Sequence, residues 1–303
     1  MFSPGKPPPG AVAPPRRSAY WRSWFLIGLL LWLASVGVTY WTGNTYLLPT
    51  VVLLGSFLVP SSFVIWAHER YAADIGDDHI VACFAVGGVI GVLGASVLEY
   101  YLLAHANVGL YAGIGLIEEA VKLGALALLS RNLPNYSMRV GMVLGAAVGH
   151  GFAAFESAGY AFNAVVTEHS LSLREVVSTE VLRGVLAPIG HGLWTSILGA
   201  VLFSTRRDGR FRFTWTLLWS YLGVSALHAF WDSTHGLAVW ITGRLTVPDW
   251  SYGLFDRGYI QDPTHRQVEL QTFFSWAGLA LCGVVGLLWL WWLARRSRRY
   301  SPG

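Results

Sequence analysis

The stretch Gly113–Leu129, "GIGLIEEAVKLGALALL", places two adjacent glutamates and a lysine inside a run that is otherwise apolar enough to cross a membrane. On insertion scales, a charge at the centre of a bilayer costs roughly 2.5–3.5 kcal/mol. Glu118, Glu119 and Lys122 therefore need partners inside the protein. The lysine follows Glu118 by one helical turn, so it is able to neutralise either carboxylate.

The composition of the whole chain indicates a membrane protein. Of its 303 residues, 54% are hydrophobic and 13% are charged, and the mean hydropathy is +0.48. Soluble domains contain about 25% charged residues, so this chain has about half the usual share. The net charge of +4 comes from short basic clusters between apolar runs, which fits membrane topology better than nucleic-acid binding. The two cysteines are far apart and predict neither a disulfide framework nor a thiolate metal site.

Apolar runs of about 20 residues predict the domain organisation. We expect an all-α, polytopic fold of about eight transmembrane helices, with a four-helix catalytic core at 109–241. A disordered Pro-rich cytoplasmic tail is expected at 1–22, the transmembrane domain at 23–295 and a basic cytoplasmic tail at 296–303. The eight predicted spans are 24–41, 46–66, 80–104, 109–130, 139–165, 181–204, 213–241 and 271–293.

The distribution of basic residues predicts the orientation of these spans. Fifteen of the 21 lysines and arginines fall in segments on the side of the termini, four fall on the other side, and two lie within spans. Because cytoplasmic loops carry an excess of lysine and arginine, both termini are predicted to be cytoplasmic.

Ionisable side chains occur within four consecutive predicted spans. At 1.5 Å per residue they lie roughly 14–20 Å below the outer ends of those spans, so we expect them to meet at a common depth. His228 and Asp232 share one helix face, because they are four residues apart. The residues concerned are Glu118, Glu119 and Lys122; His150 and Glu156; Arg183 and His191; and His228, Asp232 and His235.

Two imidazoles and several carboxylates, without thiolates, are a ligand set that suits Zn²⁺ or a similar divalent ion. A metal would lower the pKa of bound water towards 7, and a free glutamate could take its proton. His150 lies on a different face from Glu156, so we expect it to be a packing residue. Arg183 is expected to pair with a carboxylate or to snorkel, and the role of His235 stays open.

The ordered motifs of these spans resemble the PrsW family of bacterial intramembrane proteases, within the larger group of CAAX prenyl endopeptidases and Abi proteins. The resemblance covers roughly residues 109–241. Lys122 and Glu156 favour the PrsW branch. The motifs are E-E-x-x-K at Glu118, Glu119 and Lys122; F-x-x-x-E at Phe152 and Glu156; a lone His191; and H-x-x-x-N/D at His228 and Asp232.

The resemblance implies hydrolysis of peptide bonds inside a bacterial cytoplasmic membrane, with one glutamate of the pair activating water. It leaves open whether a divalent metal, Zn²⁺ being the first candidate, is obligatory or whether glutamate and histidine act without one. The implied catalytic group is Glu119, Glu118, Lys122 and Glu156, and the implied metal ligands are His191, His228 and Asp232.

The expected partners are the lipid bilayer and a transmembrane or membrane-anchored protein substrate, such as an anti-sigma factor, and no nucleic acid. The sequence leaves the substrate and the oligomeric state open. Two other functions use the same residues: a proton-coupled transporter in which the carboxylates and imidazoles form a relay, and a non-catalytic scaffold of the same fold.

Overall fold

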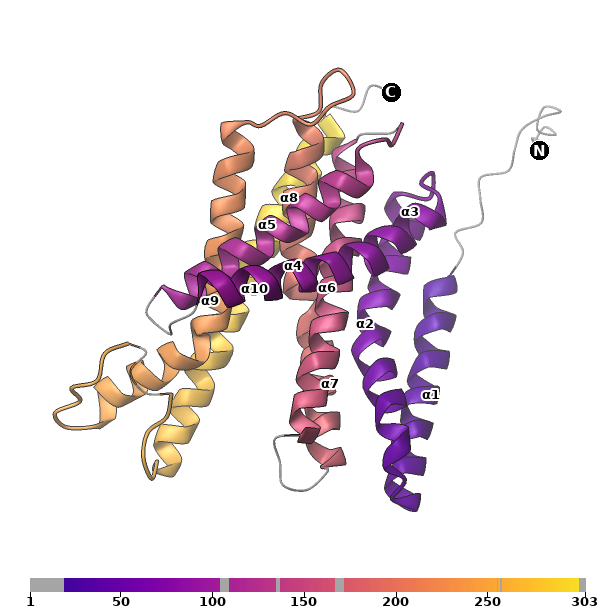
Figure 1. Cartoon of the computed structure of the whole chain (residues 1–303). Helices are drawn as coiled ribbons and strands as arrows, with labels where there is room; N and C mark the ends of the chain where they lie inside the picture. The colour runs from indigo at the N-terminus through magenta and orange to yellow at the C-terminus, as the bar shows by residue number, and fades with distance from the viewer. Residues whose placement is uncertain are drawn as a thin grey trace, which may run out of the picture.

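The computed structural model describes residues 19–103, 109–134, 137–166, 172–254, 256 and 258–299. This part of the chain is helical and contains no β-strand, which confirms the predicted all-α fold (Figure 1). The predicted tail 1–22 lies outside the described residues as far as residue 18. The elements are α1 (Tyr20–Thr42), η1 (Thr45–Leu47), α2 (Leu48–Tyr71), α3 (Asp77–Val81), the π-helical turn η2 (Ala82–Val86), α4 (Gly87–Leu102), α5 (Leu110–Ser130), α6 (Met138–Val166), α7 (Leu173–Leu186), η3 (Ala187–Ile189), α8 (His191–Ser204), α9 (Trp215–Thr246) and α10 (His265–Arg299).

Helices occupy all eight ranges that the sequence predicts as spans. Six helical segments of the described chain are long and apolar enough to cross a membrane. Neither α5 nor α9 is among them: α5 carries three charged residues within its 21, and α9 is rich in serine, threonine, tryptophan and histidine. These two helices hold the acidic pair and His228, so the polar residues of the site themselves lower the hydropathy of their helices.

The sixth predicted span is a broken helix rather than a continuous one. After α7, a short 3-10 turn that contains Pro188 leads through Gly190 into α8, whose first residue is His191. Proline has no N–H for a helical hydrogen bond and clashes with the preceding turn, which accounts for the break. The break places His191 at the end of a helix, where its position depends on both α7 and α8.

Glycines bring α6 and α8 into backbone contact. A Cβ atom added at Gly145 would lie 2.3 Å from the carbonyl oxygen of Thr195, and one added at Gly149 would lie 2.3 Å from the carbonyl oxygen of His191. Small residues at four-residue spacing are the usual means by which membrane helices approach each other closely. As a result, the backbone of His191 lies directly against α6, the helix that carries Glu156.

The segment α3–η2–α4 runs across the other helices instead of alongside them (Figure 1). Its contact with α6 is also close, since a Cβ atom added at Gly88 would lie 2.6 Å from the carbonyl carbon of Gly151. The larger apolar core of the described residues includes Leu126, Leu144 and Trp194.

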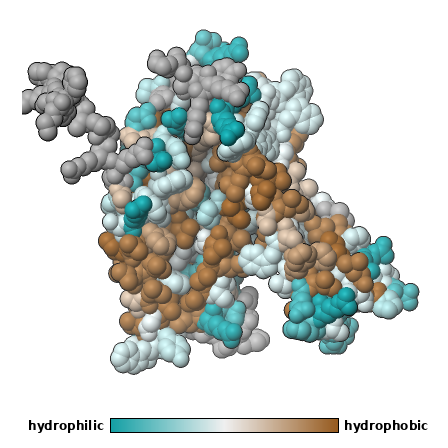
Figure 2. Space-filling model, turned by 180° about the vertical axis from the view of Figure 1, so that it is seen from behind, coloured by the Kyte–Doolittle hydropathy of each residue, from teal (hydrophilic) through white to brown (hydrophobic). Residues whose placement is uncertain are grey.

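The outer surface is apolar over much of its height, as a lipid-facing surface requires (Figure 2). Leu30 on α1 and Phe273 on α10 are examples of large apolar side chains that are exposed there. Helix α1 begins, and helix α10 ends, at the same end of the molecule (Figure 1). Towards the opposite end, α7 separates from the pair α9 and α10 (Figure 1).

Candidate active site

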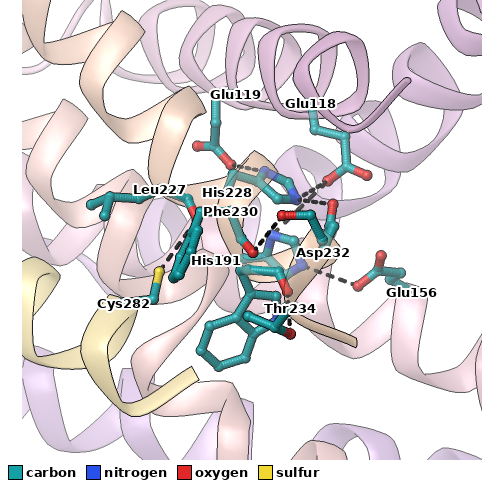
Figure 3. Close-up of polar contacts among 12 residues, drawn as sticks. Glu118, Glu119, Glu156, His191, Leu227, His228, Phe230, Asp232, Thr234 and Cys282 are labelled. Carbon is teal, nitrogen blue, oxygen red and sulfur yellow. Dashed lines mark hydrogen bonds and ion pairs between the residues drawn. The ribbon is translucent and has the colours of Figure 1, made fainter. Parts of the chain in front are cut away.

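The ionisable residues of five helices meet in one cluster inside the bundle (Figure 3). We call this group the Glu/His cluster. It comprises Glu118, Glu119 and Lys122 from α5, Glu156 from α6, Arg183 from α7, His191 from α8, and His228 and Asp232 from α9. The structure therefore brings together every catalytic and metal-binding candidate that the sequence singled out.

Lys122 lies at the centre of the cluster and is fully buried. Its Nζ donates hydrogen bonds to Glu119 Oε1 at 2.8 Å and to Glu118 Oε2 at 3.1 Å. It also lies 2.8 Å from His191 Nδ1 and 4.0 Å from the ring centroid of Phe152. The acidic pair of the opening stretch is thus compensated first by its own lysine, as predicted, and the aromatic ring covers the ammonium group.

His228 lies between carboxylates and is almost fully buried (Figure 3). Its Nδ1 donates to Glu119 Oε1 at 3.0 Å, because an ionised carboxylate accepts only. Its Nε2 faces Asp232 Oδ2 at 3.3 Å and Glu118 Oε2 at 3.7 Å. The other oxygen of Glu119, Oε2, is buried without a hydrogen-bond partner among the described residues.

The contacts of His191 determine which of its ring nitrogens carries the proton. A lysine ammonium group donates and does not accept, so His191 Nδ1 accepts from Lys122. The proton of the neutral ring is then on Nε2, which lies 3.1 Å from Glu156 Oε2 and donates to it. The same carboxylate oxygen is contacted by Arg183 Nη2.

Among the described residues, the exposed fractions of the side chains differ between the two parts of the cluster. The side chains of Glu118, Glu119, Lys122 and His228 are at most 8% exposed, whereas those of Glu156 and Asp232 are 22% and 27% exposed. Trp194 packs against both imidazoles, with ring centroids 5.2 Å from His191 and 4.7 Å from His228. Trp194 therefore covers both imidazoles, and the cluster is partly open to its surroundings at Glu156 and Asp232.

The donor atoms fit a divalent metal ion. Glu118, His191 and His228 each offer one ligand atom within 4.8 Å of the others. The nitrogens nearest Glu118 Oε2 are His191 Nδ1 at 3.9 Å and His228 Nε2 at 3.7 Å. In both rings the opposite nitrogen donates to a carboxylate, of Glu156 and of Glu119, which is the usual arrangement behind a metal-bound imidazole.

The charges of the cluster support the same fit. Four carboxylates face two permanent cations, Lys122 and Arg183, so with neutral imidazoles two negative charges remain in a largely buried site. One divalent ion would balance them. The ammonium group of Lys122 contacts two of the three atoms that would bind the ion, Glu118 Oε2 and His191 Nδ1. A bound ion would therefore have to displace the ammonium group from them.

Asp232, His150 and His235 differ in their relation to this donor set. Asp232 Oδ2 lies 3.3 Å from His228 Nε2, so its role as a metal ligand stays a prediction. Glu118, which was predicted as a catalytic residue, forms the donor group with the two histidines. His150 stacks on Phe63 with ring centroids 4.6 Å apart, in agreement with the expected packing role. His235 is exposed and its Nε2 lies 3.2 Å from the carbonyl oxygen of Gly258, outside the cluster.

Arg183 pairs with the carboxylate of Glu156, which is one of the two roles that the sequence predicted for it, whereas sequence reasoning missed Trp194. An arginine inside a span is itself a signal, since such residues are rare unless they pair with a carboxylate. Trp194 gave no signal, because it is one of fifteen tryptophans in the chain.

An all-α membrane protein with a buried group of glutamates, histidines and one lysine is the class that this fold and site define. The model of one family, the PrsW family intramembrane metalloprotease, matches residues 77–250, which is more than half of the chain. The chain therefore belongs to the PrsW family of intramembrane metalloproteases. Comparisons with curated proteins and with solved structures give no match. The matched range contains the whole Glu/His cluster.

Proposed function

We propose that this protein is an endopeptidase of the bacterial cytoplasmic membrane, with both termini cytoplasmic, that hydrolyses peptide bonds of membrane-associated polypeptides. The observation that carries the proposal is the carboxylate of Glu119. One of its oxygens is held by Lys122 and His228, and the other is buried without a partner among the described residues. A fixed carboxylate with one unpaired oxygen is suited to take a proton from a water molecule that enters the cluster.

The hydrolytic step follows from these contacts. Glu119 Oε2 accepts a proton from a water molecule, whose oxygen attacks the carbonyl carbon of the peptide bond. The C–N bond of the resulting tetrahedral species then breaks, and Glu119 returns the proton to the leaving nitrogen. His228 and Lys122 hold Glu119 in place throughout, and Glu118 assists through the same lysine.

Glu118, His191 and His228 would hold a divalent ion, with Asp232 beside His228. When bound, such an ion acts as a Lewis acid and lowers the pKa of water, and the nitrogen and oxygen ligands suit Zn²⁺. We further propose that the protein belongs to the larger group of CAAX prenyl endopeptidases and Abi proteins, because its ordered glutamate and histidine motifs resemble those of that group.

A hollow beside α7, the helix that carries Arg183, supports a substrate that lies in the membrane. A hollow of about 500 Å³ separates α7 from α10 and is lined by Val181, Leu182 and Val185 of α7 and by Trp276 of α10, among others. Figure 2 shows the molecule open at this end, with apolar side chains on both sides of the opening. We propose that a transmembrane or membrane-anchored protein, such as an anti-sigma factor, approaches the cluster from this side.

Cleavage of a single-span reporter protein by the purified enzyme in liposomes tests the proposal. We expect Glu119→Gln, His191→Ala and His228→Ala to reduce cleavage to background. The matched control is Glu180→Gln, a buried glutamate of α7 outside the cluster whose amide would still accept the hydrogen bond from Trp32. Unchanged cleavage in all three cluster variants would refute the proposal, and proton flux without cleavage would favour the transporter.

A further inference from the structure

Arg183 is the member of the Glu/His cluster to which the family motifs assign no role. It lies on α7, and its contacts reach across to three residues of α6. Its Nη2 contacts Glu156 Oε2, its Nε donates to Ser157 Oγ at 2.7 Å, and its guanidinium carbon lies 4.2 Å from the ring centroid of Tyr160. Three directed contacts fix the plane of the guanidinium group.

These contacts require an arginine rather than any cation. A guanidinium group presents several N–H groups in a rigid fork and stacks on aromatic rings, whereas an ammonium group is a compact point charge. A lysine at this position could retain the charge beside Glu156 but could not contact Ser157 and Tyr160 at the same time. Arg183 therefore fixes the direction as well as the charge of the Glu156 carboxylate.

Glu156 transmits this constraint to His191. The carboxylate oxygen that Arg183 contacts is also the one that accepts from His191 Nε2. While that acceptor stays in place, the proton of His191 remains on Nε2 and its Nδ1 lone pair points towards Lys122 and Glu118. His191 needs such support, because it begins a helix directly after the break at Gly190.

We propose that Arg183 is a positioning residue for His191: it holds Glu156 so that the imidazole keeps its Nε2–H tautomer and presents Nδ1 to the interior of the cluster. The effect on turnover rests on the proposed function, whereas the effect on the imidazole does not. Loss of a residue that orients a histidine through a carboxylate typically lowers activity or metal affinity about 10- to 100-fold.

Kinetics of Arg183 variants form the first arm of the test. We expect Arg183→Gln and Arg183→Ala to lower kcat about 10- to 100-fold with KM nearly unchanged. Because the Arg183 side chain is 25% exposed, added guanidinium ions should partly restore Arg183→Ala. Arg183→Lys should recover only part of the rate. The control is Glu175→Gln, which removes an exposed charge from the same helix at a residue that does not line the hollow between α7 and α10. A change in KM alone would overturn the proposal.

Nitrogen NMR of isotope-labelled histidine forms the second arm and needs no substrate. The signals of His191, assigned by their loss in His191→Ala, should show a protonated Nε2 in the wild type and a mixture of tautomers in Arg183→Gln. Ser157→Ala, which removes one contact and keeps the charge, should give a smaller change and serves if Arg183→Gln does not fold. Unchanged His191 signals in folded Arg183 variants would overturn the proposal even if the wild-type protein cleaves nothing.

Discussion

Replacement of Gly149 by alanine tests how accurately α8 must be placed. A Cβ atom at this position would lie 2.3 Å from the carbonyl oxygen of His191 and 2.8 Å from its carbonyl carbon. Ordinary contact begins at about 3.4 Å, so α6 and the first turn of α8 have to move apart by about 1.1 Å. Since the colliding atoms belong to the backbone, rotation of a side chain cannot relieve the clash. A misplacement of about 1 Å in catalytic geometry can cost about 100-fold in rate.

Gly159→Ala is the matched control, because it lies on the same helix and a Cβ atom there meets nothing within 4 Å. Alanine stabilises a helix by roughly 0.5–1 kcal/mol relative to glycine, so this variant should unfold at the same or a higher temperature. For Gly149→Ala, overpacking of about 1–3 kcal/mol should outweigh that gain. The assay combines cleavage of the single-span reporter in liposomes with thermal unfolding in detergent. Wild-type cleavage and an unchanged unfolding temperature in Gly149→Ala would refute this reasoning.

Three further perturbations probe other parts of the molecule. Lys122→Met leaves the two buried glutamates without their cation and should destabilise the fold by about 3–5 kcal/mol; Glu118→Gln should partly restore the unfolding temperature of that variant, and no restoration would contradict the pairing. Trp32→Phe removes the 2.8 Å hydrogen bond to buried Glu180 and should cost about 1–3 kcal/mol in the free energy of unfolding; an unchanged unfolding curve would count against this contact. A chemical cross-link between Leu182→Cys and Trp276→Cys, across the hollow, should block cleavage of the single-span reporter, and undiminished cleavage would exclude this approach route.

The residues of the site could be found from the sequence because an ionisable side chain within an apolar helix costs free energy unless it has a partner. Glu118, Glu119 and Lys122 interrupt an apolar run, and His228 and Asp232 share one helix face. Charges inside a membrane helix need partners, so a common depth was sufficient to predict that they meet. Which atoms pair between different helices could not be predicted, because that depends on the rotations of five helices about their axes.

The break between α7 and α8 could not be predicted from the sequence. Pro188 and Gly190 were visible in the sixth predicted span, yet hydropathy alone gives one continuous apolar run there. Proline is tolerated within membrane helices when neighbouring groups satisfy the freed backbone, so its presence does not decide between a kink and a break. The positions of His191 and Arg183 on separate helices follow from this break.

The most direct measurement is cleavage of the single-span reporter in heavy-oxygen water, with wild-type protein and Glu119→Gln side by side in liposomes. If the Glu/His cluster activates water, the wild-type product carries one heavy oxygen atom in its new terminal carboxyl group, and Glu119→Gln yields no product above background. Product formation by Glu119→Gln at the wild-type rate would contradict the assignment of hydrolysis to this cluster.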